Sequence, residues 1–247
     1  MGTLDFSRRD LVSWKNHFKI EIGGNIISYC YIRKNACSAF KNFFSACSRF
    51  QNIPGEGTLQ FMMRCHRATL EDVRHSDYII CVLRDPVARA ISLFQNKFIQ
   101  QCGNVDIFKN YELITGHDPV QASFREFVEI YLSKPLDSLD PHAHTQASHL
   151  MPVKYNAAII IEELEKEMSN IVGEDISRSF FSKRRNATQI EGNSIFSSDE
   201  DLSCIPAETI RQRGTPRGGQ LCTPDLAATL REIYAEDCTI IEAYCPT

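Results

Sequence analysis

The sequence predicts an α/β fold of three layers, in which a central parallel sheet is flanked by helices. Three near-continuous apolar runs, at 26–32, 78–83 and 157–161, are typical of strands in a parallel sheet that is covered on both faces. Each run is followed by a segment whose apolar residues have helical spacing. Strands that alternate with helices build right-handed βαβ units, and this connectivity makes the sheet parallel.

The helices are predicted in chain order from the spacing of their apolar residues. Those that follow the three strands are expected at 40–47, 86–98 and 162–171, and two others at 123–132 and 224–244. Pro86 suits the first turn of its helix. The region 186–222 is rich in Ser, Gly, Arg and Pro and has no clear period, so it is predicted to be a loop.

Length and charge limit what the chain can bind. A chain of 247 residues with 43% hydrophobic residues suits a single domain over 1–247. Its formal net charge of −4 gives no polycationic field for nucleic acid, so any anion site must be local. No apolar run approaches the length of a membrane helix, which predicts no membrane partner. The oligomeric state cannot be predicted from the sequence.

Cysteine usage and the N-terminus indicate the compartment. The ten cysteines are scattered without a CxxC pair, which disfavours a zinc site, and Cys30 and Cys81 lie in apolar runs as small hydrophobes. No signal-peptide h-region follows Met1, so a reducing cytoplasm is expected. The sequon at Asn186 leaves open a Golgi-lumen domain that has been trimmed of its anchor.

The stretch RKNACSA, residues 33–39, joins the first strand to its helix. A strand that ends in a loop opening a helix presents backbone N–H groups and the positive end of the helix dipole to an anion. Small side chains allow close approach, Lys34 supplies charge, and the Ser38 hydroxyl can donate a hydrogen bond. The lysine precedes the small residues, unlike in GxxxxGK[ST], so a standard NTPase is disfavoured. The alternative is a turn capped by Ser38 or Asn35.

The stretch LRDPVARAISLF repeats this arrangement after the second strand. Arg84 is expected where the strand ends, at the edge of the sheet where α/β proteins bind ligands, and Ser92 about two helical turns later. Two cationic elements suggest a ligand with two separated anionic groups. Arg89 is expected to pair with Asp85 or Asp77 and to hold the turn in place.

These motifs together resemble the sulfotransferases that use 3′-phosphoadenosine-5′-phosphosulfate (PAPS), most closely the carbohydrate sulfotransferases of the HNK-1 and chondroitin/dermatan type. KNACSAFK is similar to the element P-K-x-G-C-T-x-W-K, with Arg33, Ala36 and Phe40 at the proline, glycine and tryptophan positions. RDPVARAISLFQNKF matches R-D-P-x-x-R-x-x-S-x-x-x-x-K-F without a break. The resemblance implies a P-loop-like fold and transfer of a sulfuryl group to a hydroxyl or amine.

The resemblance also implies roles for individual residues. Lys34 would act in catalysis by neutralising charge on the leaving phosphate, and the 5′-phosphosulfate would lie on the first motif. Arg84 and Ser92 would hold the 3′-phosphate. RQRGTPRGG, at 211–219, loosely resembles the basic loop that closes over that phosphate in cytosolic sulfotransferases. The predicted cofactor-binding residues are therefore Arg33, Lys34, Asn35, Ala36, Cys37, Ser38, Ala39, Arg84, Ser92 and Arg213.

A histidine is the natural base for the acceptor proton, since its pKa lies near neutrality. DPHAHTQ, at 140–146, is similar to the family's D-x-H-W-x-P-Q element, and this match favours His142. Ala143 and Thr145 replace the tryptophan and the proline. The competing candidates are His144, His149 and His66.

Two other functional classes stay open. A P-loop kinase or NTPase would require a Walker motif and a magnesium-binding carboxylate, and RKNACSA lacks the former. A non-catalytic adenosine bisphosphate binder would have lost the base, whereas Lys34 and His142 are both present. The acceptor is expected to be a small molecule or a carbohydrate, with 186–222 on its side of the site. The mildly acidic charge of the chain favours the small molecule, because a long polyanion would require a broad basic face.

Overall fold

The computed structural model describes residues 1–7, 16–182, 196, 197 and 199–244. The chain divides into two compact units. Unit 1 comprises residues 1–84, 146–185 and 241–247, and unit 2 comprises residues 85–145 and 186–240. The expected single domain over 1–247 stays a prediction.

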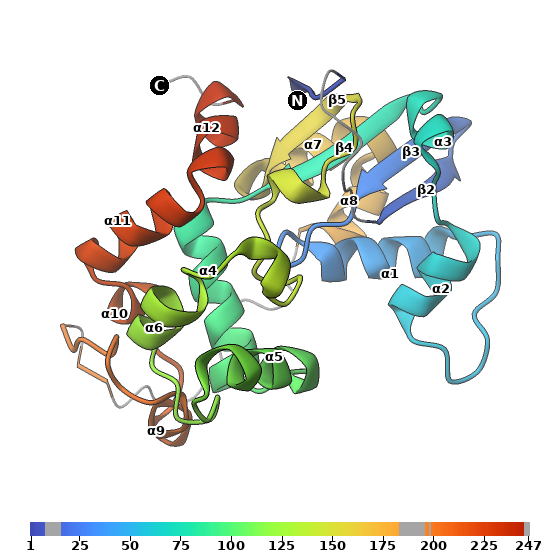
Figure 1. Cartoon of the computed structure of the whole chain (residues 1–247). Helices are drawn as coiled ribbons and strands as arrows, with labels where there is room; N and C mark the ends of the chain where they lie inside the picture. The colour runs from blue at the N-terminus through green and yellow to red at the C-terminus, as the bar shows by residue number, and fades with distance from the viewer. Residues whose placement is uncertain (8–15, 183–195, 198, 245–247) are drawn as a thin grey trace. The chain divides into compact units, whose positions relative to one another are not determined.

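Unit 1 contains a five-stranded sheet in the order β1-β5-β4-β3-β2 (Figure 1). The strands are β1 (Gly2–Asp5), β2 (His17–Ile22), β3 (Asn25–Cys30), β4 (Tyr78–Leu83) and β5 (Lys154–Ile160). The three predicted strands form the parallel centre, whereas β1 and β2 pair antiparallel at the edges. The α/β class is therefore confirmed, with a mixed rather than wholly parallel sheet.

One face of the sheet packs against α1 (Cys37–Cys47), α2 (Thr58–Cys65), α7 (Leu164–Val172) and α8 (Glu174–Phe180). Unit 1 also contains α3 (Leu70–Arg74) and the short 3-10 helices η4 (Ala147–His149) and η5 (Ile161–Glu163). Tyr29 of β3 stacks on Phe40 of α1 with ring centroids 3.7 Å apart, and Met168 of α7 lies in the same core. Burying these rings holds the start of α1 against the sheet.

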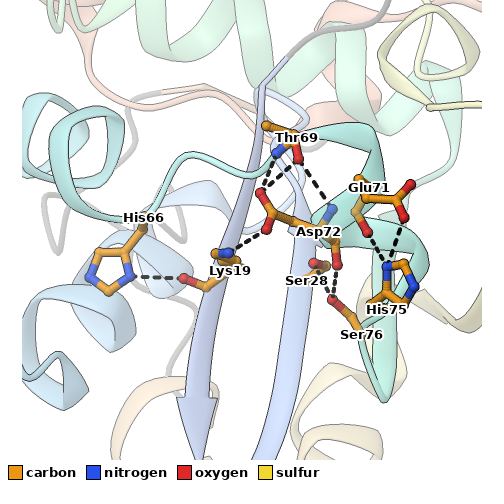
Figure 2. A network of polar contacts seen from close by, with 8 residues as sticks. All are labelled: Lys19, Ser28, His66, Thr69, Glu71, Asp72, His75 and Ser76. Carbon is orange, nitrogen blue, oxygen red and sulfur yellow. Dashed lines mark hydrogen bonds and ion pairs between the residues drawn. The ribbon is translucent and has the colours of Figure 1, made fainter.

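The outer edge of β2 is covered by the segment that follows α2. The Lys19 N–H donates to the carbonyl of His66, and the Ala68 N–H donates to the carbonyl of His17. The His66 ring donates from Nδ1 to the Lys19 carbonyl, and the Lys19 ammonium pairs with Asp72 (Figure 2). The hydrogen bond from Lys19 lowers the pKa of Asp72 to about 2.

Unit 2 is helical. Its helices are α4 (Pro86–Phe94), η1 (Gln95–Ile99), α5 (Val105–Thr115), α6 (Phe124–Glu126), η2 (Phe127–Tyr131), η3 (Leu136–Ser138), α9 (Ala207–Arg213), α10 (Gly218–Leu221), α11 (Pro224–Ile233) and α12 (Ala235–Tyr244), of which 235–240 belong to this unit. The rings of Phe94, Phe98 and Phe127 meet at centroid distances of 5.1–5.5 Å and form its core.

The structure differs from the predicted helices and from the predicted loop in several places. The segments 95–99 and 127–131 continue their α-helices as π-helical turns. The expected helix over 224–244 breaks at Tyr234, whose hydroxyl donates to the Ala143 carbonyl at 2.7 Å. The region 186–222 is a loop only in part, because it contains α9 and α10, and its residues 186–195 and 198 lie outside the described part of the chain.

Candidate functional site

The turn into α1 leaves the helix N-terminus without a cap of its own. Ala36 occupies the N-cap position in the left-handed conformation (φ 57°) and has no side-chain acceptor, and the first turn contains no acidic residue. Lys34 is also left-handed, with φ 71°. A helix start with small residues and no side-chain cap suits an incoming anion, because the anion can approach the positive end of the helix dipole closely.

The predicted residues of this turn differ in exposure. Arg33, Lys34, Ala36, Cys37 and Ser38 are half-buried, whereas Asn35 and Ala39 are buried. The Asn35 N–H donates to the Ile32 carbonyl at 3.2 Å, and its side chain donates to backbone and side-chain oxygens inside unit 1. The contacts of Asn35 are therefore structural, and its inclusion among the cofactor-binding residues stays a prediction.

Arg84 joins the first motif to the end of β4. Its Nη1 donates to the Lys34 carbonyl at 3.1 Å, so the structure brings together the two cations that the sequence placed at the ends of neighbouring strands. The side chain of Gln146 pairs with the peptide groups of Arg84, accepting from its N–H at 3.0 Å and donating to its carbonyl at 2.8 Å. Lys34 and Arg84 thus share one bonded network.

The turn into α4 is different, because Asp85 caps the helix itself. Its Oδ1 accepts from the Ala88 N–H at 2.8 Å, and Pro86 stands in the first turn. Ser92 is half-buried on this helix. Arg89 is buried, and its Nη2 donates to the His142 carbonyl at 3.1 Å. Arg89 therefore has a structural contact, although at a partner that the sequence did not predict.

The segment at 140–143 holds a carboxylate and a histidine in contact. His142 Nδ1 lies 2.6 Å from Asp140 Oδ1, which also accepts from the His142 N–H at 2.8 Å. Because a carboxylate only accepts hydrogen bonds, Nδ1 carries the ring proton and Nε2 is the basic nitrogen. Arg89 and Tyr234 donate to the carbonyls of His142 and Ala143. This arrangement orients the imidazole as a proton acceptor.

The competing histidines lie in other surroundings. Both ring nitrogens of His66 are hydrogen-bonded, to the Lys19 carbonyl and to the Ser48 hydroxyl, and burial lowers its pKa. His144 is buried with Nε2 at 2.9 Å from the Leu139 carbonyl, and His149 is fully buried. The His142 side chain keeps 23% of its surface exposed. Of these four histidines, His142 has the most exposed side chain and a carboxylate on Nδ1; its role as the base stays a prediction.

Arg213 contacts its own unit. Its guanidinium pairs with Glu200 at 2.8 Å and lies over the Phe196 ring, 4.6 Å from the centroid. Its role in cofactor binding stays a prediction. The basic residues 183–185 and the sequon at Asn186 lie outside the described residues.

A model of the sulfotransferase family matches residues 17–239. The chain belongs to the sulfotransferase family. No curated protein and no solved structure matches the chain. Family membership makes the protein an enzyme that transfers sulfuryl groups, and the α/β fold agrees with it. None of the described helices is long and apolar enough to cross a membrane.

In this sulfotransferase, Asp140, Gln146 and Tyr234 contact residues of the motifs, and none of these contacts was predicted from the sequence. Asp140 and Gln146 match the D-x-H-W-x-P-Q element, but the sequence did not predict a role for either residue. The aspartate two positions before His142 was a usable signal for the Asp140–His142 contact. Tyr234 gave no comparable signal, because its contact with Ala143 joins residues 91 apart in the chain.

Proposed function

We propose that the protein transfers a sulfuryl group from PAPS to a hydroxyl or amine of a small-molecule or carbohydrate acceptor. The uncapped N-terminus of α1, with Lys34 beside it, is the observation that carries this proposal. The residues fit a phosphosulfate, since the turn combines backbone donors, small side chains and a cation. PAPS would supply a sulfuryl group on a phosphate leaving group, and no metal is required in principle.

Each motif would have one task in this reaction. Backbone N–H groups at the start of α1 and the Lys34 ammonium would bind the 5′-phosphosulfate and neutralise the charge that grows on the phosphate. Arg84 would hold the 3′-phosphate through its guanidinium, with Ser92 as a further donor. His142 Nε2 would take the proton that the acceptor loses as its oxygen or nitrogen bonds to sulfur. Asp140 would stabilise the resulting imidazolium.

The acceptor is the least constrained part of the proposal. The resemblance to carbohydrate sulfotransferases favours a sugar hydroxyl, whereas the formal net charge of −4 favours a small molecule over a long polyanion. We propose a small molecule as the first class to screen and a cytoplasmic location for the enzyme. Short neutral oligosaccharides are the second class.

Calorimetric titration with adenosine 3′,5′-bisphosphate tests the donor. The wild type should bind it tightly and should bind ATP and adenosine 5′-phosphosulfate at least tenfold more weakly, because both lack the 3′-phosphate. Arg84→Ala should lose most of this preference. Preference for ATP in the wild type would contradict PAPS dependence and support a kinase.

A transfer assay with labelled PAPS and a panel of phenols, alcohols and amines tests the base. His142→Ala should lower kcat by about 10²–10⁴-fold, the usual contribution of a general base, while the affinity for the bisphosphate is retained. His149→Ala is not a suitable control because that ring is fully buried. The exposed His75 is suitable, and His75→Ala should keep wild-type kcat. Equal activity of both variants would eliminate His142 as the base.

A further inference from the structure

The C-terminal end of β4 extends beyond its strand partner on one side. The parallel pairing of β3 with β4 runs from Ile27–Tyr78 to Tyr29–Ile80 and ends there, while β5 continues to pair as far as Leu83. Val82 and Arg84 therefore need other hydrogen-bond partners on the β3 side, because buried backbone groups are costly to leave unpaired.

Two side-chain amides take the place of the missing strand. Asn35 Nδ2 donates to the Val82 carbonyl at 2.8 Å, and Gln146 accepts from the N–H and donates to the carbonyl of Arg84. Asn35 Nδ2 also donates to Gln146 Oε1 at 2.5 Å. Asn35 is fully buried and Gln146 keeps 1% of its surface exposed. Buried amide contacts of this kind fix one arrangement, because leaving them unmade costs free energy.

The same contacts hold a strained turn. Lys34 and Ala36, on either side of Asn35, both have positive φ, which an L-residue adopts only when its surroundings impose it. The Asn35 side chain connects this turn to β4 by its hydrogen bond to the Val82 carbonyl. Arg84 Nη1 adds a second connection by donating to the Lys34 carbonyl. The conformation of the turn and the position of Arg84 therefore depend on one network.

We infer that Gln146 and Asn35 are positioning residues that hold the turn at 33–36 against the end of β4 and so set the geometry of Lys34 and Arg84 for the anionic donor. This inference rests on the proposed function, because the donor is the ligand that the two cations would bind. Neither side chain needs to touch the donor, as both are buried. The third sequence motif thus contributes Gln146 to the donor side rather than to the acceptor side.

The chain offers a matched control at the other end of β4. Asn156 Oδ1 accepts from the Ile79 N–H at 2.7 Å, and its Nδ2 donates to the Asp77 carbonyl at 2.8 Å. Like Gln146, this side chain accepts from one backbone N–H and donates to one carbonyl at an end of β4, although from an exposed position and to two residues, and it lies away from the turn. Asn156→Leu therefore removes an amide pair without changing the support of Lys34 and Arg84.

The experiment compares Gln146→Met with Asn156→Leu by calorimetry with adenosine 3′,5′-bisphosphate and by hydrogen exchange of the amides at 33–37. Gln146→Met should weaken binding at least tenfold and speed exchange in the turn at least tenfold. Asn156→Leu should stay within twofold of wild type in both, even if its Tm falls. Equal effects of the two variants, or wild-type behaviour of folded Gln146→Met, would overturn the inference.

Two further results keep the test decisive. If Gln146→Met does not fold, Asn35→Ser removes the contacts with Val82 and Gln146, leaves the pairing of Gln146 with Arg84, and should show the same selective exchange in the turn. If the wild type does not bind the bisphosphate, the proposed function fails, while the exchange comparison still decides whether the amides hold the turn. In an active enzyme, Gln146→Met should raise KM for PAPS and lower kcat together, because both cations shift.

Discussion

The two strand-to-helix turns, before α1 and before α4, look alike in sequence but end in chemically different helix N-termini. Ala36 begins α1 in the left-handed region and offers no side-chain acceptor. Asp85 begins α4 with its own carboxylate on the Ala88 N–H, and the following proline has no N–H to offer. Of these two helices, α1 alone begins without a side-chain cap of its own.

In the proposed function, this difference in capping decides which of the two helix starts would bind an anion through its backbone. Both turns follow a parallel strand and both carry a basic residue, Lys34 in one and Arg84 in the other. In the second turn, the Asp85 carboxylate already occupies the position that an anion would take at the helix N-terminus. This turn would therefore contribute only side chains to ligand binding. The two turns are thus expected to respond differently to substitution.

The largest effect is expected at the uncapped turn. Lys34→Ala should lower kcat about 10²–10³-fold, because it removes a cation that would stabilise charge on the leaving phosphate. Single-turnover transfer from labelled PAPS measures this step. Lys154→Ala, an exposed lysine on β5, should leave kcat unchanged. A kcat within threefold of wild type in Lys34→Ala would remove the main distinction between the two turns.

A carboxylate placed at position 36 of the first turn, like that of Asp85 in the second turn, should weaken anion binding. Ala36→Asp is expected to reduce the affinity for adenosine 3′,5′-bisphosphate by about 10–100-fold, since a like charge would stand at the helix N-terminus. Ala36→Gly is the control, because glycine accepts a positive φ and leaves the site uncharged. Unchanged affinity in Ala36→Asp, measured by calorimetry, would show that the α1 N-terminus is not the anion site.

Removing the cap of the second turn should affect stability more than binding. Asp85→Ala is expected to lower the free energy of unfolding by about 1 kcal/mol, the usual contribution of an N-cap. Urea denaturation measures this loss, and Asp85→Asn should recover most of it. The affinity for the bisphosphate should change less than threefold. A tenfold loss of affinity with unchanged stability would instead make Asp85 part of the ligand site.

The smallest effect is expected at Arg213, whose guanidinium already pairs with Glu200 and lies over Phe196. Arg213→Ala should change the affinity for the bisphosphate by no more than about threefold, because the pair must be given up before the arginine can bind a phosphate. Glu200→Gln removes the charge of the other partner in this ion pair and tests the same expectation. A large loss of affinity in Arg213→Ala would restore its predicted role at the 3′-phosphate.

The sequence predicted those parts of the fold that depend on local pattern. The runs around Ile27, Ile80 and Ile159 form the three parallel strands, because strands buried on both faces are apolar without interruption. β2 was missed although it alternates and is followed by Gly23–Gly24, a hairpin signal. β1 was not predicted either, because its four residues are too few to show an alternating pattern. It is a strand because it pairs with β5, which is distant in the sequence.

The sequence predicted which residues form the candidate site, but it did not predict most of the contacts between them. Lys34 and Arg84 were expected together because parallel strands end at one edge of the sheet. The contact between Asn35 and Gln146 joins residues 111 apart in the chain, so no local pattern could reveal it. The helical break at Tyr234 likewise depends on a distant carbonyl, and α9 buries only Ala207 and Ile210, too few for a helical period.

The covered edge of β2 has a consequence for how the protein can associate. A bare edge strand is a template on which another chain can add its own strand, and this is a common route to aggregation. Here the backbone groups of His17 and Lys19 are already bonded to the segment at 66–68. A second chain would have to displace that segment and separate Lys19 from Asp72, so self-association by strand addition is disfavoured at this end of the sheet.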